Sequence, residues 1–154
     1  MAVFCLTGCT KRKEEGQQLS CTLSVSCETL LDNSLLSEEK QELVPEDGYL
    51  IAPERVSFSQ GESVFDVLYR EVRNRNLHME YEKTPVYNSI YIEGIGNLYE
   101  FDAGPESGWM YRVNGVFPEY GCSSVTLQDQ DVVEWVYTCD LGKDVGCEEM
   151  RETE

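Results

Sequence analysis

The sequence predicts an α+β fold in which one main amphipathic helix packs on a β-grasp-like mixed sheet. Three observations lead to this class. Apolar and polar residues alternate strictly from Leu19 to Cys27, which is the pattern of a half-buried strand. An apolar stripe with helical spacing runs from Val64 to about Arg75. Further alternating segments follow, ending with Val132 to Thr138, and one helix laid across one sheet buries both apolar faces.

The first quarter of the chain is expected to contain the first strand and a short helix. In the segment from Leu19 to Cys27, the odd-numbered residues share an apolar face, and serine and threonine occupy the other face. Ser37 is a suitable N-cap for a short helix that extends to Leu43. Pro45 and the Asp47-Gly48 turn end this region, and a short second strand is predicted at Arg55–Ser59.

The main helix has a clear start signal. Ser63 can cap its N-terminus, and Asp66 occupies the capping-box position three residues later. Phe65, Leu68 and Val72 follow at the spacing that places them on one apolar face.

The rest of the chain is expected to form a meander of strands. Alternation predicts strands at Leu77–Tyr81 and Tyr87–Glu93, on either side of Pro85. The strand Trp109–Val113 runs into Asn114-Gly115, a strong hairpin signal. The remaining predicted elements are a return strand begun by Val116-Phe117 and cut short by Pro118, a strand at Val125–Leu127, a tight turn at Asp129–Asp131, the last strand at Val132–Thr138 and a frayed acidic segment from Lys143.

Composition excludes several classes of function. The 154 residues include 29 acidic and 12 basic side chains, giving a formal net charge of −17. A nucleic-acid partner is therefore not expected, because phosphate binding needs clustered cationic side chains. The only histidine is His78, which excludes zinc sites that need two imidazoles, and we expect it to be solvated. No metal site is predicted, since the pairs Asp129/Asp131 and Asp140/Asp144 offer too few oxygens for calcium.

Seven cysteines suggest disulfides rather than catalysis. None stands in a CxxC pair, so thioredoxin-like chemistry and zinc ribbons are not expected. If the first and last strands run side by side, Cys27 and Cys139 come together and can form a disulfide. Bridges from Cys21 to Cys27 or from Cys139 to Cys147 are alternatives, as are buried free thiols.

The N-terminus resembles a bacterial lipoprotein signal. Leu6-Thr7-Gly8-Cys9 fits a lipobox in which Cys9 is acylated, although only eight residues precede it and none of them is basic. An accidental match is the alternative. We expect residues 1–18 to be a truncated signal remnant and flexible tether, residues 19–147 to be the folded domain, and residues 148–154 to be an acidic frayed tail.

Aromatic residues around the Asn-Gly hairpin are the candidate ligand contacts. Trp109, Tyr111, Phe117 and Tyr120 flank this turn, where flat rings can stack on a planar ligand; packing within the hairpin is the alternative. Trp135, in the middle of the last strand, is predicted to lie in the core.

Four segments carry a resemblance to a known family. They are ESVFDVL from Glu62, YNSIYIEGIGNLYEFDAG from Tyr87, SGWMYRVNG from Ser107 and VVEWVYTCDLGKDVG from Val132. They resemble a bacterial family of domains of unknown function that is related to the C-terminal, cobalamin-capping domain of transcobalamin and intrinsic factor. The resemblance implies a β-grasp-like α+β domain, exported and often anchored to Firmicute cell surfaces. It also implies that Trp109, within GWMY, matches the carrier segment that approaches the vitamin.

Two positions depart from the family pattern. Relatives often carry cysteine where this chain has Ala103, as the partner of the cysteine that matches Cys122, so Cys122 is expected to be unpaired. Relatives also favour glycine at the position of Gln130, which predicts a distorted turn.

The resemblance and the residues together predict a non-enzymatic binding module. Its ligand would be a small molecule, with cobalamin or a related corrinoid as the candidate, and no cofactor is otherwise expected. The predicted location is the bacterial cell surface, outside the cell, with membrane contact only through a lipid anchor. The alternative is an adhesion, protein-interaction or spacer domain that meets a surface protein and binds no small ligand.

Overall fold

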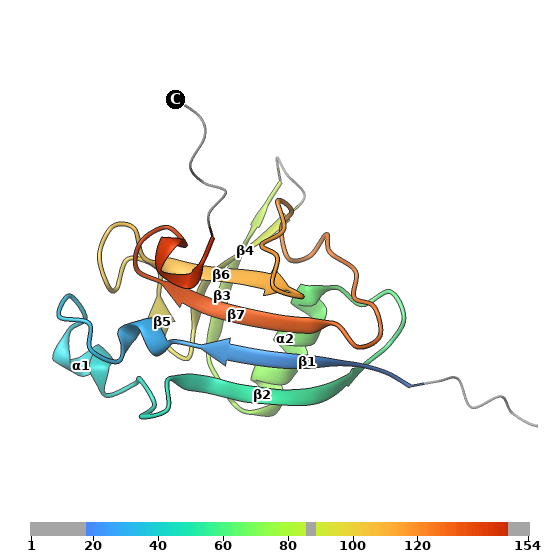
Figure 1. The fold of residues 1–154 in the computed structure, drawn as a ribbon, viewed down its shortest axis with the longest axis horizontal. Coiled ribbons are helices and arrows are strands. Elements are labelled where there is room, and N and C mark those ends of the chain that lie inside the picture. The colour runs from blue at the N-terminus through green and yellow to red at the C-terminus, as the bar shows by residue number, and fades with distance from the viewer. Residues whose placement is uncertain (1–17, 86–88, 148–154) are drawn as a thin grey trace, which may run out of the picture.

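Two β-sheets and one long helix make up the fold in this computed structural model, which describes residues 18–85 and 89–147 (Figure 1). The elements are β1 (Leu19–Ser26), η1 (Glu28–Leu30), α1 (Glu38–Gln41), β2 (Tyr49–Phe58), α2 (Val64–Asn74), β3 (Met79–Thr84), β4 (Ser89–Ile95), β5 (Leu98–Tyr99), β6 (Gly108–Val113), β7 (Val132–Thr138) and η2 (Lys143–Val145). The predicted α+β class is confirmed.

The larger sheet is mixed, as the sequence predicts. Its strand order is β2-β1-β7-β6, and β1 runs parallel to β7 while the other pairs are antiparallel. Thr22 lies opposite Val132 and Ser26 opposite Val136, so the first and last strands do run side by side. Val25 and Trp135 are buried on the inner face of this central pair.

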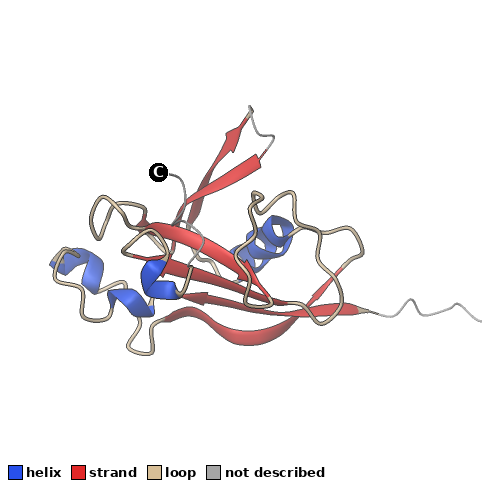
Figure 2. Cartoon of the chain, turned by 45° about the horizontal axis from the view of Figure 1, so that its top comes forward, coloured by secondary structure: helices blue, strands red, loops and turns tan. Residues whose placement is uncertain are grey.

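The remaining strands form a second sheet, where the sequence predicts only one. Strands β3, β4 and β5 pair in that order, and the β3–β4 ribbon projects away from the larger sheet (Figure 2). The chain bends sharply after β5 because Phe101 and Gly104 both have positive φ, at 68° and 106°. The Phe101 amide donates to Ser107 O at 3.0 Å, which closes this bend before β6 begins.

Helix α2 begins with the predicted capping box. The Ser63 hydroxyl accepts from the Asp66 amide at 3.2 Å, and the Asp66 carboxylate accepts from the Ser63 amide at 2.8 Å. Val64, Val67, Leu68 and Val72 are buried beneath the larger sheet, behind which α2 lies in Figure 1. The helix therefore supplies the second layer of the core.

Strand β2 is longer than the predicted Arg55–Ser59. Pro53 lies inside it, and the register with β1 shifts between the pairs Leu23–Glu54 and Val25–Ile51. Proline is tolerated there because β2 is an edge strand and the extra residues form a bulge.

The predicted turns form, but two predicted short strands do not. Asn114 and Gly115 both have positive φ, and the amides of Val113 and Val116 bond reciprocally at 2.9 and 3.1 Å. The return strand at Val116-Phe117 is only this one bridge, because Pro118 lacks an amide proton for a ladder. Similarly, the segment Val125–Leu127 contributes a single bridge to Ser63.

Gln130 stands in the left-handed region at the turn before β7. Its φ is +71°, which explains why a glycine would suit this position.

The C-terminal segment is ordered further than the sequence predicts. Residues Lys143–Val145 form η2, and Cys147 is buried. The Asp144 carboxylate accepts from the Cys139 amide at 2.7 Å and from the Thr138 hydroxyl, which fixes this turn against the end of β7. The predicted tail 148–154 and the N-terminal segment with Cys9 lie outside the described residues.

Candidate functional site

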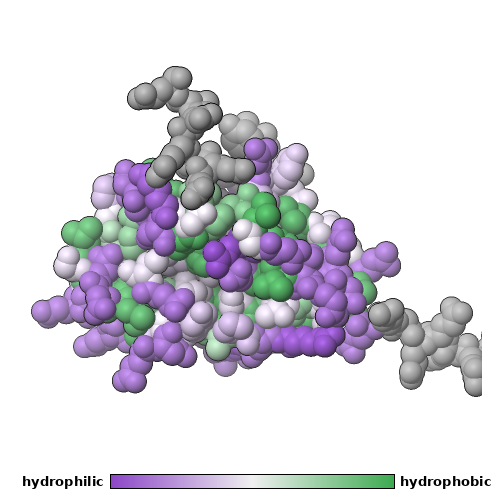
Figure 3. All heavy atoms as spheres, viewed as in Figure 1, coloured by the Kyte–Doolittle hydropathy of each residue, from purple (hydrophilic) through white to green (hydrophobic). Residues whose placement is uncertain are grey.

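A pocket of about 530 Å³ lies where the second sheet approaches the free edge of β6. Its walls come from β4, β6 and the loop from Phe117 to Ser124, and Trp135 of β7 also lines it. Figure 3 shows apolar side chains over this part of the molecule, in the upper half of the view. The volume lies within the range of ordinary small-ligand pockets.

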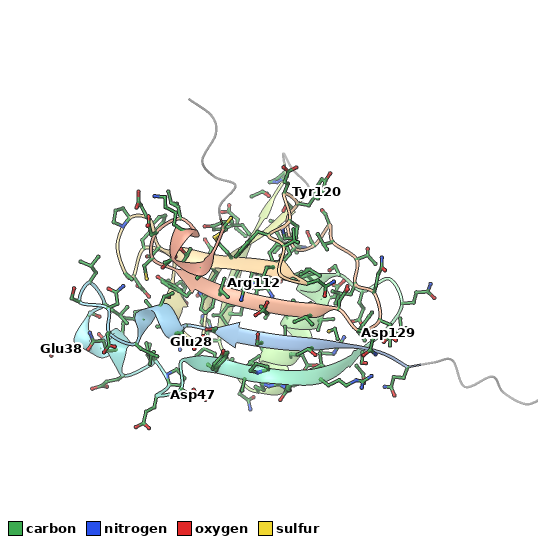
Figure 4. All side chains as sticks on the ribbon, viewed as in Figure 1. Glu28, Glu38, Asp47, Arg112, Tyr120 and Asp129 are labelled. Carbon is green, nitrogen blue, oxygen red and sulfur yellow. The ribbon has the colours of Figure 1, made fainter. Side chains whose placement is uncertain are left out.

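All four aromatic residues that the sequence singles out line this pocket. They are Trp109 and Tyr111 on β6, and Phe117 and Tyr120 on the loop that follows. Tyr120 is 70% exposed and stands at the rim, at the top of the molecule in Figure 4. The structure thus brings the predicted residues together, and ligand contact by them stays a prediction.

Trp109 is held by the core more than by the pocket. It is 6% exposed, and its indole N–H donates to Leu98 O at 2.8 Å. Its ring packs edge-on against Tyr137, with centroids 5.2 Å apart. Only part of the Trp109 ring can therefore face a ligand.

Trp135 was predicted to lie in the core, and it does, with 2% exposure. It also belongs to the pocket wall, which the sequence does not indicate. Its ring lies opposite Tyr111 across the β6–β7 pair, with ring centroids 5.2 Å apart. Its indole nitrogen is the one buried side-chain polar atom without a hydrogen-bond partner in residues 18–85 and 89–147.

The loop that forms the outer wall is tied down on three sides. The Tyr111 hydroxyl donates to Tyr120 O, and the Ser123 hydroxyl accepts from the Ile90 amide at 3.2 Å. The amide of Phe65, in the first turn of α2, donates to Cys122 O at 3.1 Å. The pocket is therefore largely preformed.

The pocket is nearly free of charge. Burial raises the pKa of the Cys122 thiol to about 12, and it raises the pKa of Tyr111 as well. Both groups are therefore neutral at physiological pH. Glu119, which is exposed at the rim, is the only charged residue in the described lining.

The predicted Cys27–Cys139 disulfide is not formed in the structure. The five cysteines among the described residues are all free thiols. In the parallel register, Cys27 follows Ser26, which lies opposite Val136, so Cys139 sits further along β7 than Cys27 reaches. The Cys139 sulfur instead accepts from the side-chain Nδ2 of Asn33 at 3.2 Å and donates to Thr29 O at 3.8 Å.

Asp129 and Asp131, which were considered for calcium, accept hydrogen bonds that hold turns in place. The Asp129 carboxylate accepts from the Ser20 amide at 2.9 Å, and Asp131 accepts from the Asn114 side chain at 2.9 Å. The described part of the chain holds no group of three or more metal-ligating side chains. His78 is exposed and its Nε2 lies 3.1 Å from Glu80.

In residues 18–85 and 89–147, no helix has the length and apolar character that crossing a bilayer requires.

Comparison with known proteins agrees with this fold. A family model described as "Domain of unknown function (DUF4430)" matches residues 61–139. The crystal structure of haptocorrin in complex with Cbi (cobinamide) superposes with a TM-score of 0.59 at 13% identity, covering 80% of this chain and 26% of haptocorrin. A "putative metal binding protein" from Ruminococcus gnavus superposes with a TM-score of 0.47 at 13% identity, covering 78% of this chain and 96% of that one.

No curated protein matches the sequence. The family match and the haptocorrin fold confirm the resemblance to transcobalamin-like domains. At 13% identity the likeness concerns the fold, and this chain spans about a quarter of the length of haptocorrin.

Proposed function

The chain belongs to the family described as domain of unknown function DUF4430, and on this premise we propose that it is a non-enzymatic binding module for a small ligand. The observation that carries the proposal is the preformed pocket in which Trp109, Tyr111, Phe117 and Tyr120 converge. Apolar pockets with a few polar groups are the usual form of small-molecule sites.

The chemistry of the titratable groups favours binding over catalysis. The Cys122 thiol has a pKa raised to about 12 by burial, so it is not a nucleophile at neutral pH. His78, the residue type most often used for proton transfer, is paired with Glu80 and Tyr99 on the surface.

Cobalamin or a related corrinoid is the candidate ligand. A corrin ring is flat and broad, and aromatic side chains at a pocket rim can contact one of its faces. Haptocorrin, whose fold is similar, was crystallised with Cbi. Because this chain matches only 26% of haptocorrin, we expect weaker binding than a complete two-sided site would give, or dependence on a partner chain.

Titration of the purified protein with cyanocobalamin tests this ligand. We expect a shift in the visible spectrum and heat of binding, with affinity falling about tenfold in Tyr120→Ala because the exposed ring would lose its contact. Stability should change by less than about 0.5 kcal/mol, since Tyr120 is largely exposed. Val116→Ala, also exposed but outside the pocket lining, is the matched control and should bind normally. No heat and no spectral shift at millimolar cyanocobalamin would rule corrinoids out.

We also propose that the module works outside the cell and is lipid-anchored through Cys9. The sequence Leu6-Thr7-Gly8-Cys9 and the polar stretch after it support this location. Mass spectrometry of protein isolated from its native membrane should find acyl chains on Cys9. An unmodified Cys9 in that preparation would contradict the anchor.

The second candidate function is adhesion or protein interaction without a small ligand. It is favoured by two large exposed apolar side chains, Leu35 (68% exposed) and Phe101 (62% exposed). The Leu35 side chain lies close to Gly104, whose backbone amide donates to Phe101 O. The cyanocobalamin titration separates the two functions. If the pocket is the functional site, the double variant L35S/F101S should bind cyanocobalamin as tightly as the unchanged protein; if neither protein binds it, the adhesion function is favoured.

A further inference from the structure

The residues that line the pocket disfavour a ligand with a negative charge. Its described residues include aromatic, aliphatic and hydroxyl side chains but no lysine or arginine, and Glu119 adds a negative charge at the rim. The nearest ionisable groups inside, Tyr111 and Cys122, have pKa values raised by burial and are neutral. A carboxylate or phosphate in this pocket would lose its hydration and meet no positive charge from the described lining residues. The Arg112 guanidinium, which lies 5.9 Å from the centroid of the Phe117 ring, is already paired with Glu134.

The charge of the whole chain acts in the same direction. The formal net charge is −17, and such an excess lowers the local concentration of anions at the surface. Flat apolar molecules without a negative charge do not experience this repulsion.

One donor in the pocket wall has no acceptor among the described residues. The Trp135 indole N–H belongs to a pocket-lining side chain and makes no hydrogen bond in the described residues. Neighbouring atoms cover it, so a ligand reaches it only when these neighbours move aside. An unpaired buried donor is energetically costly, and a ligand that offers an acceptor would recover part of this cost. In contrast, the other buried tryptophan, Trp109, already has its acceptor in Leu98 O.

We propose that the pocket takes a flat, largely apolar ligand, or such a portion of a larger ligand, that carries no negative charge and presents a hydrogen-bond acceptor to Trp135. The inference rests on the proposed binding function and specifies the chemical class of its ligand. Stacking on Tyr111 and Tyr120 would supply most of the affinity, and the Trp135 N–H would orient the acceptor group.

Three ring-matched probes test the inference. They are 2-naphthamide, which is neutral with a carbonyl acceptor; 2-naphthoate, which is anionic; and protonated 2-naphthylmethylamine, which has no acceptor. By calorimetry we expect 2-naphthamide to bind, and 2-naphthoate to bind at least about tenfold more weakly for want of a cationic partner.

The Trp135→Phe variant tests the hydrogen bond. It should lower the affinity for 2-naphthamide about fivefold more than the affinity for 2-naphthylmethylamine, because only the amide has an acceptor for the N–H. In nuclear magnetic resonance spectra, 2-naphthamide should shift the indole N–H signal of Trp135, with the bonded Trp109 N–H as internal reference.

The outcomes distinguish an error in the proposed ligand class from an error in the proposed small-ligand function. If 2-naphthoate binds as tightly as 2-naphthamide, or if Trp135→Phe weakens amide and amine equally, the ligand class is wrong although the pocket binds. If none of the three probes binds and the Trp135 signal does not move, the small-ligand function is contradicted as well.

Discussion

Replacing Trp109 with alanine is expected to lower the free energy of unfolding by about 4 kcal/mol, measured by urea denaturation. Trp109 is 6% exposed and packs edge-on against Tyr137, so the substitution would leave a large cavity. It would also leave Leu98 O without its donor in a buried position. Because single domains are stable by only about 5–15 kcal/mol, this change removes much of the total.

The two tryptophans provide a matched control for the hydrogen-bond part of this loss. Both are buried, but Trp109 donates to Leu98 O and Trp135 donates to no described residue. Trp109→Phe should therefore cost about 1–2 kcal/mol more than Trp135→Phe, since only the first orphans an acceptor. Equal costs for the two substitutions would show that the Trp109 hydrogen bond contributes little.

This structural role changes how ligand binding at Trp109 can be tested. The sequence makes Trp109 the leading candidate for ligand contact, yet its burial means that an alanine variant loses binding through unfolding alone. Tyr120 is the better probe because its side chain is exposed at the rim and its removal leaves the core intact.

The best-predicted elements are those whose local pattern and long-range packing agree. The alternation in β1, the capping box of α2 and the apolar face of β7 each predict the right type of element. The expectation that β1 is only half-buried is wrong, because Ser20, Ser24 and Ser26 on its polar face are buried as well. Strand β2 was predicted too short because Pro53 is an unfavourable residue in a strand. Only the edge position and the bulge, neither visible in a local pattern, make it acceptable.

The division into two sheets could not be predicted from local pattern. It depends on the bend after β5, where Phe101 adopts a positive φ that its side chain disfavours. Nothing in the residue type signals this conformation, which is fixed by the hydrogen bond from the Phe101 amide to Ser107 O.

The pocket residues that are close together in the sequence could be predicted, and those that only strand pairing brings together could not. The Asn114-Gly115 turn fixes the chain on both of its sides, so the aromatics of β6 and the following loop could be grouped from sequence. Ile90 and Trp135 join the pocket only because β4 approaches β6 and β7 pairs with it. A tryptophan in mid-strand gave no signal that it also borders a pocket.

Alkaline pH is expected to unfold the reduced domain cooperatively. After Trp109→Ala, this is the second change for which we expect a large loss of stability. Burial raises the pKa of Cys21 from 9.0 to about 11, and the pKa values of Cys27 and Cys122 from 9.0 to about 12. It raises the pKa of Tyr137 from 10.0 to about 12. These groups are almost fully covered in the folded state, so their ionised forms are accessible mainly by unfolding.

The direction follows from proton binding. Between the unfolded value of 9.0 and the folded value of about 12, the native thiols of Cys27 and Cys122 stay protonated while the unfolded thiols release their protons. The stability that these groups contribute is therefore complete below the unfolded pKa and is lost as pH rises through this window. At the middle of the window each buried thiol should cost on the order of 2 kcal/mol, and several acting together approach the whole stability of the domain.

Circular dichroism and thiolate absorbance, followed together in reducing buffer, measure this linkage. We expect the two signals to change at the same pH, because thiolate appears only as the chain unfolds. Cys122→Ala should make the free energy of unfolding fall less steeply with pH, by up to about 1.4 kcal/mol per pH unit in the alkaline window. Cys139→Ala is the matched control and should alter the slope less, since that thiol is only partly buried. Thiolate absorbance that rises while the circular dichroism stays native would mean that the thiols ionise inside the folded domain, and the burial argument for their pKa values would be wrong.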